Sequence, residues 1–106
     1  MAEPSRGEVW LVDLGFAAKV RPCLVMSIPP TEDNDRVLIT VVAHTTSLRG
    51  SRFEVSIPLR FLKPGCFDSQ NLITIPKAKL IRRLGSLDAQ QLDQVVSSLR
   101  KWLGIS

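Results

Sequence analysis

Two apolar segments, Arg21-Pro-Cys-Leu-Val-Met-Ser-Ile28 and Arg36-Val-Leu-Ile-Thr-Val-Val-Ala43, decide the fold of this chain. Both are rich in β-branched or bulky apolar residues and are bounded by turn formers, which is typical of buried strands. The segment between them, Pro29-Pro-Thr-Glu-Asp-Asn-Asp35, holds two prolines and four acidic or amide residues, so it cannot continue a strand. The sequence therefore predicts an antiparallel hairpin with a polar loop.

The register of this hairpin has a chemical consequence. If the strands pair outward from the loop, Arg21 lies opposite Ala43, and the segment His44-Thr-Thr-Ser47 leaves the sheet beside Arg21. Because side chains alternate between faces, Thr45 then shares the face of Arg21, while His44 points the other way. We expect a cation and a run of hydroxyls to meet at one end of the sheet. A one-residue slip, or a bulge near Ala43, would exchange the roles of Thr45 and His44.

Four further segments have the pattern of short strands: Gly7–Asp13, Phe53–Ile57, Asp68–Ile75 and Ala78–Leu84. The first contains Trp10, which we expect in the core or an interface, since no second aromatic residue accompanies it as a stacking platform. Several strands at short intervals in so small a chain favour a mainly β fold, either a strongly curved antiparallel sheet or a small barrel.

The last segment changes to the period of a helix. Apolar residues recur along it at spacings of three and four: Leu92, Val95, Val96, Leu99, Trp102 and Leu103. Asp88 and Gln91 have the spacing of a capping box at its start, and Gly104 ends it. We expect this helix to cover one opening of the barrel, with its apolar stripe, Trp102 included, facing the core.

Composition indicates one globular domain over residues 1–106, because 44% of the residues are hydrophobic and there is no room for a separate catalytic module. Cys23 and Cys66 form neither a disulfide framework nor a paired metal-ligand spacing, so we expect reduced thiols in a cytoplasmic protein. The chain shows no basic, apolar leader and no apolar run of membrane-spanning length. We therefore expect it to be neither exported nor embedded in a membrane.

The net charge of +4 hides an asymmetry along the chain. Residues 1–48 carry four basic and six acidic groups, a net charge of −2, whereas residues 49–106 carry ten basic and four acidic groups, a net charge of +6. The basic half is compatible with a polyanionic partner. A modest excess of lysine and arginine is also common on the surface of small proteins, so charge alone does not identify one.

The residue types exclude several mechanisms. A single histidine, His44, and ten scattered acids give no metal-ligand cluster, no Ser-His-Asp arrangement and no phosphate-binding loop before a helix. A phosphate-directed site remains, because the guanidinium of Arg21 is a planar fork of donors matched to phosphate oxygens. Thr45 and Thr46 add hydroxyl donors beside it. An arginine before a proline and a polar turn are also ordinary structural features, so geometry must decide.

RNA is a suitable substrate for such a site because it carries its own nucleophile, the 2′-hydroxyl. The protein would align the attack, stabilise the phosphorane oxygens and move two protons without a metal ion. Arg21 suits the stabilising role but is a poor base, because it holds its proton strongly. His44 is the right chemical type for proton transfer, although the alternation turns it away. The sequence offers no obvious general base.

A series of motifs in order along nearly the whole chain resembles the MazF/PemK family of bacterial toxins: Arg6-Gly-Glu-Val-Trp10, Arg21-Pro-Cys-Leu-Val-Met26, His44-Thr-Thr-Ser47, Phe53-Glu-Val55, Asp68-Ser-Gln70 and Leu103-Gly-Ile105. The resemblance implies a small SH3-like antiparallel barrel with a C-terminal helix, forming a homodimer. It also implies a metal-independent, sequence-specific endoribonuclease, with no cofactor, that cleaves single-stranded RNA, chiefly mRNA. The products would be a 2′,3′-cyclic phosphate and a 5′-hydroxyl. A cognate antitoxin with an acidic C-terminal segment would hold the toxin inactive.

The same resemblance carries two catalytic residues onto this chain. The family's arginine before a proline corresponds to Arg21, and its threonine at the end of the third strand corresponds to Thr45. Four further residues are expected to contact the substrate: His44, Thr46, Arg49 and Arg52. One departure is the connection Leu14–Val20, which is shorter than the mobile, substrate-contacting loop of many members and leaves the cleavage sequence open.

Two alternatives remain. The tail Trp102-Leu-Gly-Ile105 is similar to the Trp-Gly-Ile end of CcdB, a protein of the same fold that poisons DNA gyrase by protein contact. The inserted Leu103 and the helical stripe predict that Trp102 is buried, which argues against this function. The second alternative is a non-catalytic module that binds RNA or an antitoxin, which would bind in a strongly salt-dependent way without cleavage.

Overall fold

The computed structural model describes residues 3–105, which contain one antiparallel sheet and one α-helix. The sheet has the spatial strand order β4-β5-β3-β2-β1-β6. Its strands are β1 (Glu8–Asp13), β2 (Val20–Val25), β3 (Leu38–Thr45), β4 (Glu54–Val55), β5 (Cys66–Pro76) and β6 (Leu80–Ser86), and helix α1 spans Ala89–Leu103. Short 3-10 helices, η1 (Phe16–Ala18) and η2 (Lys77–Lys79), lie in the β1–β2 and β5–β6 connections.

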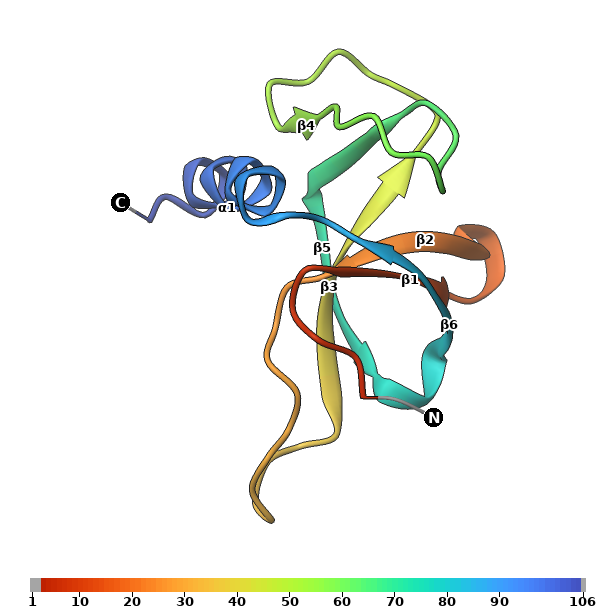
Figure 1. The fold of residues 1–106 in the computed structure, drawn as a ribbon, viewed down its shortest axis with the longest axis vertical. Helices are drawn as coiled ribbons and strands as arrows, with labels where there is room; N and C mark the ends of the chain where they lie inside the picture. Colours follow the sequence, from red (N-terminus) through yellow and green to blue (C-terminus); the bar gives the residue numbers. More distant parts are fainter. Residues whose placement is uncertain (1–2, 106) are drawn as a thin grey trace.

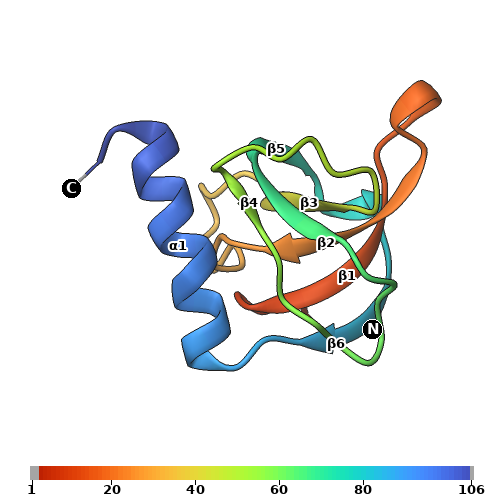
Figure 2. The same cartoon turned by 90° about the horizontal axis from the view of Figure 1, so that it is seen from above.

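The sheet curves strongly, so that its strands cross one another in projection (Figure 1). Helix α1 stands along one side of the sheet, and the β1–β2 connection projects from the opposite side (Figure 2). Among residues 3–105 no pairing joins the edge strands β4 and β6, so the sheet is open rather than a closed barrel. The mainly β class with a C-terminal helix is confirmed. Within this described part of the chain, no helix is long and apolar enough to cross a membrane.

The central hairpin is present, but its register differs by two residues from the expected one. Cys23, rather than Arg21, pairs with Ala43. Because strand alternation has a period of two, a shift of two residues leaves every side chain on its predicted face. If the observed pairing is continued by two residues away from the hairpin loop, Arg21 is level with Thr45.

The strand limits also differ from the predicted ones. The loop of the hairpin covers residues 26–37, so both predicted strands lose their loop-side ends. The Ser27 hydroxyl accepts a hydrogen bond from the Thr40 amide at 2.9 Å, a side-chain bond where a longer ladder would have used the backbone. Elsewhere, the predicted strand Phe53–Ile57 shrinks to the two residues of β4, and Ala78 lies in η2 rather than in a strand.

The pairing of β3 with β5 contains a bulge near the end of β3 that carries Thr45. The extra residues of this bulge belong to β5 rather than to β3. In the pairing of these two strands, Val42 faces Leu72 and His44 faces Phe67, so the register shifts between them on the β5 side. The alternation of β3 therefore continues undisturbed to Thr45, and the predicted faces of His44 and Thr45 are retained.

Apolar side chains cover both faces of the central strands. The first cluster comprises Trp10, Val12, Cys23, Val25, Ile39, Val41, Ala43, Ile75 and Leu80. The second cluster, to which α1 contributes, comprises Val9, Leu24, Val42, Ile57, Phe67, Leu87, Val95 and Leu99. Trp10 lies in the core as predicted, with 2% of its surface exposed. Both cysteines, Cys23 and Cys66, are buried free thiols.

Helix α1 begins and ends where the sequence predicts. The Asp88 side chain accepts a hydrogen bond from the Gln91 amide at 2.8 Å, and the Gln91 side chain accepts one from the Asp88 amide at 3.0 Å, which completes the capping box. Gly104 ends the helix in the left-handed conformation. The prediction that Trp102 is buried is wrong, because 43% of its surface is exposed. The last turn of α1 carries its stripe away from the sheet, so Leu103 is exposed as well, and the Trp102 ring packs on Phe53 with the centroids 5.3 Å apart.

The connection between β4 and β5, residues 56–65, is fastened to the sheet by an aromatic ring. The ring of Phe61 lies so close to Gly85 of β6 that a Cβ atom on this glycine would meet it at 2.4 Å. The β1–β6 pairing is irregular next to this point, between Val9 and Trp10, which face Gly85 and Arg83. A glycine at the irregularity thus lets the connection pack directly on the edge strand.

Gly85→Ala is expected to lower the free energy of unfolding by about 1–3 kcal/mol, because the new methyl group would overlap the Phe61 ring. Ser86→Ala, at the exposed neighbouring position, is the matched control and should change it by less than about 0.5 kcal/mol. Urea titration followed by tryptophan fluorescence measures both changes. Equal stabilities of the two variants would show that Phe61 moves aside without cost.

Candidate active site

Arg21 and Thr45 lie at the same end of the sheet, on the neighbouring strands β2 and β3. Both side chains are half-buried, and both line two hollows that meet at this end. The Thr45 hydroxyl accepts a hydrogen bond from the Ser47 amide at 3.0 Å, which turns the chain as it leaves β3. The cation and the hydroxyls that the sequence predicts at one end of the sheet are therefore brought together.

A second glycine holds the backbone at Thr45 in place. A Cβ atom on Gly65 would lie 2.2 Å from the Thr45 carbonyl oxygen and 2.9 Å from Cε1 of His44. Only glycine can bring the end of the 56–65 connection so close to β3. The position of Thr45 thus depends on contact between two backbones as well as on its own strand.

The larger hollow has a volume of about 480 Å³ and is cationic. Arg21, Lys63 and Arg82 line it together with the hydroxyl side chains Thr45, Thr46 and Ser47. Its apolar lining comes from β1, β2, β6 and the 56–65 connection, and none of its lining residues is acidic. We call this space the cationic hollow. It is suited to a polyanion, because cations that share a concave site reinforce one another's field.

The smaller hollow, of about 280 Å³, has mixed charge. It is lined by Arg21 and Arg49 and also by the carboxylates of Glu54 and Asp68. The Glu54 carboxylate accepts hydrogen bonds from the Arg49 amide at 3.0 Å and the Ser51 amide at 2.9 Å, and these bonds lower its pKa. Glu54 is therefore an ionised group that holds the 49–51 turn. We call this space the mixed-charge hollow.

The Asp68 carboxylate accepts fewer hydrogen bonds from the local backbone than the Glu54 carboxylate does. One of its oxygens accepts a hydrogen bond from the Gln70 amide at 3.1 Å. Asp68 pairs with Glu54 across β4 and β5 and lines the mixed-charge hollow together with Arg21 and Thr45. A carboxylate is thus present in the same hollow as the arginine and the threonine.

His44 lies on the opposite face from Thr45, as the alternation predicts. Only 4% of its surface is exposed, and its ring meets Phe67 in a T-shaped contact with centroids 5.0 Å apart. Burial lowers the pKa of His44, so the imidazole stays neutral at neutral pH. It forms part of the lining of the cationic hollow.

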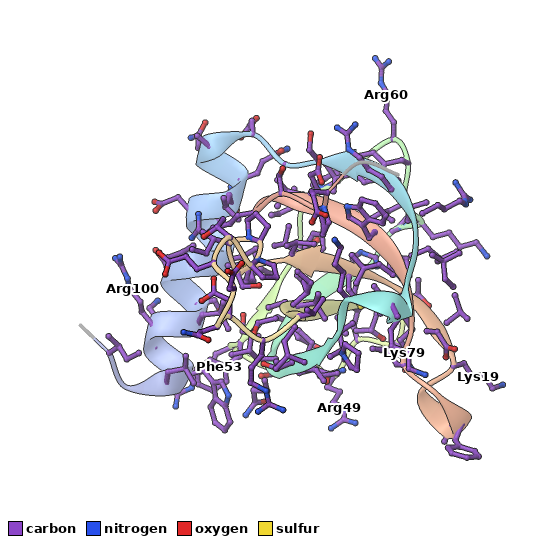
Figure 3. All side chains as sticks on the ribbon, turned by 90° about the horizontal axis from the view of Figure 1, so that it is seen from below. Lys19, Arg49, Phe53, Arg60, Lys79 and Arg100 are labelled. Atoms are coloured by element: carbon purple, nitrogen blue, oxygen red, sulfur yellow. The ribbon has the colours of Figure 1, made fainter. Side chains whose placement is uncertain are left out.

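The remaining predicted contacts divide into two groups. Thr46 lines the cationic hollow and Arg49 lines the mixed-charge hollow, so both lie with Arg21 and Thr45. Arg52 lies elsewhere, because its guanidinium carbon is 4.6 Å from the centroid of the Phe53 ring. Figure 3 shows Phe53 toward the C-terminal end of α1, apart from Arg49.

Sequence reasoning assigned no role to four residues that line these hollows: Glu54, Lys63, Asp68 and Arg82. Lys63 comes from the 56–65 connection and Arg82 from the edge strand β6, so neither is near Arg21 in the sequence. The glycines at positions 65 and 85, which bring these segments together, were the available signal. Among residues 3–105, no group of three or more His, Cys, Asp or Glu side chains is placed to hold a metal ion.

Comparison with known proteins agrees with the fold. Residues 5–103 match the family model described as PemK-like, MazF-like toxin of type II toxin-antitoxin system. An endoribonuclease in complex with its cognate antitoxin, from a mycobacterial species, is similar with a TM-score of 0.81 and 24% sequence identity over 98% of each chain. The MazE-MazF structure (Form-II) from Deinococcus radiodurans has a TM-score of 0.81 and 22% identity over 100% of each chain. The Mycobacterium tuberculosis toxin MazF-mt6 has a TM-score of 0.76 and 25% identity, over 93% of this chain and 98% of that one.

His44→Phe is expected to flatten the pH dependence of stability between about pH 7 and pH 5. Burial lowers the pKa of His44 below its ordinary value of 6.5, so on acidification the unfolded chain takes up a proton here before the folded chain does. The free energy of unfolding of the wild type should therefore decrease as the pH is lowered across this window. Phenylalanine keeps the ring contact with Phe67 but binds no proton. Urea unfolding at several pH values measures both slopes, and identical slopes would contradict the assignment.

Proposed function

Because the chain belongs to the PemK-like, MazF-like toxins of type II toxin-antitoxin systems, we propose that it is a metal-independent, sequence-specific endoribonuclease that cleaves single-stranded RNA, chiefly mRNA. The similar mycobacterial structure described above is an endoribonuclease, which supports this activity. The observation that carries the proposal is the placement of Arg21 and Thr45 on adjacent strands, where both hollows meet. A phosphate seated there reaches a guanidinium and a hydroxyl together.

The proposed reaction uses the substrate's own nucleophile. The 2′-oxygen attacks phosphorus, the bond from phosphorus to the 5′-oxygen breaks, and the products are a 2′,3′-cyclic phosphate and a 5′-hydroxyl. Arg21 binds the non-bridging oxygens and stabilises the negative charge that develops on them. Thr45 donates its hydroxyl to the same phosphate and holds it in line with the attack.

Two protons move in this reaction, one from the 2′-hydroxyl and one to the leaving 5′-oxygen. We assign the first to Asp68, whose carboxylate lines the same hollow as Arg21 and Thr45. Glu54 is less suitable, because backbone amides already occupy its carboxylate. His44 lines the other hollow and is almost wholly buried. Arg21 contacts the same phosphate and donates a hydrogen bond to the leaving oxygen, which takes its proton from solvent water.

The remaining residues have binding roles in this proposal. Thr46 and Arg49 contact the sugar-phosphate backbone from the two hollows that they line. His44 forms part of the wall against which the substrate rests. Arg52 stacks on Phe53 beside Trp102, so a contact from Arg52 would be to RNA beyond the scissile phosphate.

We propose that residues 1–106 act as a single toxin domain, as a homodimer in the cytoplasm. A cognate antitoxin with an acidic C-terminal segment would inhibit it. The similar mycobacterial endoribonuclease was solved in complex with its cognate antitoxin, and the similar Deinococcus structure is of MazE-MazF. Both support an antitoxin as a partner of this chain. The net charge of +6 on residues 49–106 supports both an acidic segment and RNA as partners.

Gyrase poisoning is the weaker candidate. The exposed Trp102 removes one argument against it, because that side chain is accessible for a protein contact. The family match, however, extends over residues 5–103 and is to the MazF-like toxins. DNA breaks trapped on gyrase, lost on truncation of residues 102–106, would favour the poison over the ribonuclease.

Arg21→Ala and Thr45→Ala are each expected to slow RNA cleavage by about 10²- to 10³-fold, the typical loss when one donor to a developing oxyanion is removed. Thr45→Ser keeps a hydroxyl and should retain most of the activity. Arg36→Ala, in the β2–β3 loop, is the control for loss of an exposed cation. Initial rates on long single-stranded RNA in EDTA, with mapping of the new ends, measure the effect. Intact RNA at high enzyme concentration, or a metal requirement, would refute the ribonuclease.

Asp68→Asn is expected to slow cleavage by about 10²- to 10⁴-fold, because the amide cannot accept the 2′-hydroxyl proton. RNA binding should be unchanged or tighter, since a negative charge leaves the site. Asp93→Asn, on the exposed face of α1, is the matched control. Single-turnover cleavage and binding titrations separate the two effects. Cleavage at the wild-type rate would remove Asp68 from the mechanism.

A further inference from the structure

We propose that the cationic hollow is a second phosphate subsite, in which Lys63 and Arg82 bind the RNA phosphate next to the scissile one. This inference rests on the proposed ribonuclease function and adds to it the path of the RNA strand. Arg21 lines the hollow with these two residues, so the subsite adjoins the position of the scissile phosphate.

The charges of the two hollows indicate which hollow the RNA strand enters next to the scissile phosphate. In the mixed-charge hollow, a second phosphate would meet the carboxylates of Glu54 and Asp68 as well as Arg49, so it would be bound less favourably there. The cationic hollow has no acidic lining residue and has the larger volume, about 480 Å³. A strand whose scissile phosphate lies between Arg21 and Thr45 therefore continues into the cationic hollow.

The pairing of the strands shows how the two arginines reach the hollow. Arg21 of β2 pairs with Val12 of β1, and Arg82 of β6 pairs with the preceding residue, Leu11. Because paired residues share a face and successive residues alternate, Arg21 and Arg82 come to the one hollow from different faces of the sheet. Two cations that approach from different sides suit two neighbouring phosphates better than a single phosphate.

The use of neighbouring arginines supports this assignment. Arg83 donates to the Glu8 carboxylate at 3.1 Å and is thereby neutralised. Within residues 3–105 no carboxylate forms an ion pair with Lys63 or Arg82. These two charges therefore remain available to an anionic ligand in the hollow.

Lys63 is carried by a segment that the sheet holds in place. The 56–65 connection is fastened at Phe61, which packs on Gly85, and at Gly65, which touches the backbone of Thr45. The turn that contains Phe61 is closed by a hydrogen bond from the Leu62 amide to the Leu59 carbonyl at 3.2 Å. Arg60 belongs to the same segment but projects away from the body of the protein (Figure 3), and it lines neither hollow.

The test is the salt dependence of binding to a fluorescein-labelled, mixed-sequence single-stranded RNA with 2′-O-methyl riboses. This RNA has no free 2′-hydroxyl and cannot be cleaved, so binding is measured alone. The double variant Lys63→Ala/Arg82→Ala should reduce the slope of log K against log salt concentration by about 0.7, the contribution of one phosphate of a single strand. The double variant Arg60→Ala/Arg36→Ala removes the same charge elsewhere and should keep the wild-type slope.

A second measurement places the lost contact. In cleavable RNA, a neutral methylphosphonate is placed on one side and then on the other of the mapped cleavage site. In one of these positions, the methylphosphonate should slow cleavage by the wild type as much as the Lys63→Ala/Arg82→Ala substitutions slow cleavage of unmodified RNA. In that same position, it should not slow cleavage by the double variant any further. Independent, additive losses at both positions would overturn the subsite.

The outcomes separate the subsite from the ribonuclease. If the wild type cleaves RNA and the Lys63/Arg82 double variant keeps the control's slope and rate, the subsite is wrong and the ribonuclease stands. If the slope falls as expected but the wild type never cleaves, the hollow binds RNA and the ribonuclease is wrong. If the wild type does not bind RNA, both are wrong. Unchanged RNA binding with loss of binding to an acidic peptide would assign the hollow to a protein partner and overturn the subsite.

Discussion

The burial of β3 on both of its faces is the constraint on which the rest of the structure depends. Ile39, Val41 and Ala43 pack into one apolar cluster and Val42 into the other, and all four are essentially inaccessible to water. A slip of one residue against β2 would exchange the two sets, so each cluster would receive side chains whose volumes do not fit it, and such misfits typically cost about 1–3 kcal/mol. The register is therefore held by the core, and Thr45 inherits its place beside Arg21 from that packing.

The parts of the fold that depend on local pattern were predictable from the sequence. The hairpin, the faces of His44 and Thr45, and both ends of α1 follow from alternation, turn residues and capping. The exact register did not, because the pattern of residues shows that a polar loop is present but not how many residues it takes up, and here it covers residues 26–37. The exposure of Trp102 also escaped prediction, since a helical stripe shows which face is apolar but not where the sheet beneath it ends.

The candidate site was predictable only where it lies on one hairpin. Arg21, Thr45 and Thr46 are neighbours through a single pairing, whereas Lys63 and Arg82 reach the same hollow from a connection and an edge strand. Their convergence depends on Gly65 and Gly85, where a side chain would collide with Thr45 or Phe61. Such a close approach depends on two segments that are distant in the sequence, so the residue pattern of either segment alone does not predict it.

The two cysteines lie beside the strands that carry the site. Cys23 pairs with Ala43 and Cys66 pairs with Thr45, and burial is the main reason that the pKa of Cys23 rises to about 12 and that of Cys66 to about 11. At neutral pH roughly one thiol in ten thousand or fewer is then ionised, and only the thiolate reacts readily. We therefore expect both thiols of the folded protein to react slowly with alkylating and oxidising agents. Opening of this end of the sheet would expose the thiols and speed their alkylation, so the alkylation rate would report local unfolding at the site.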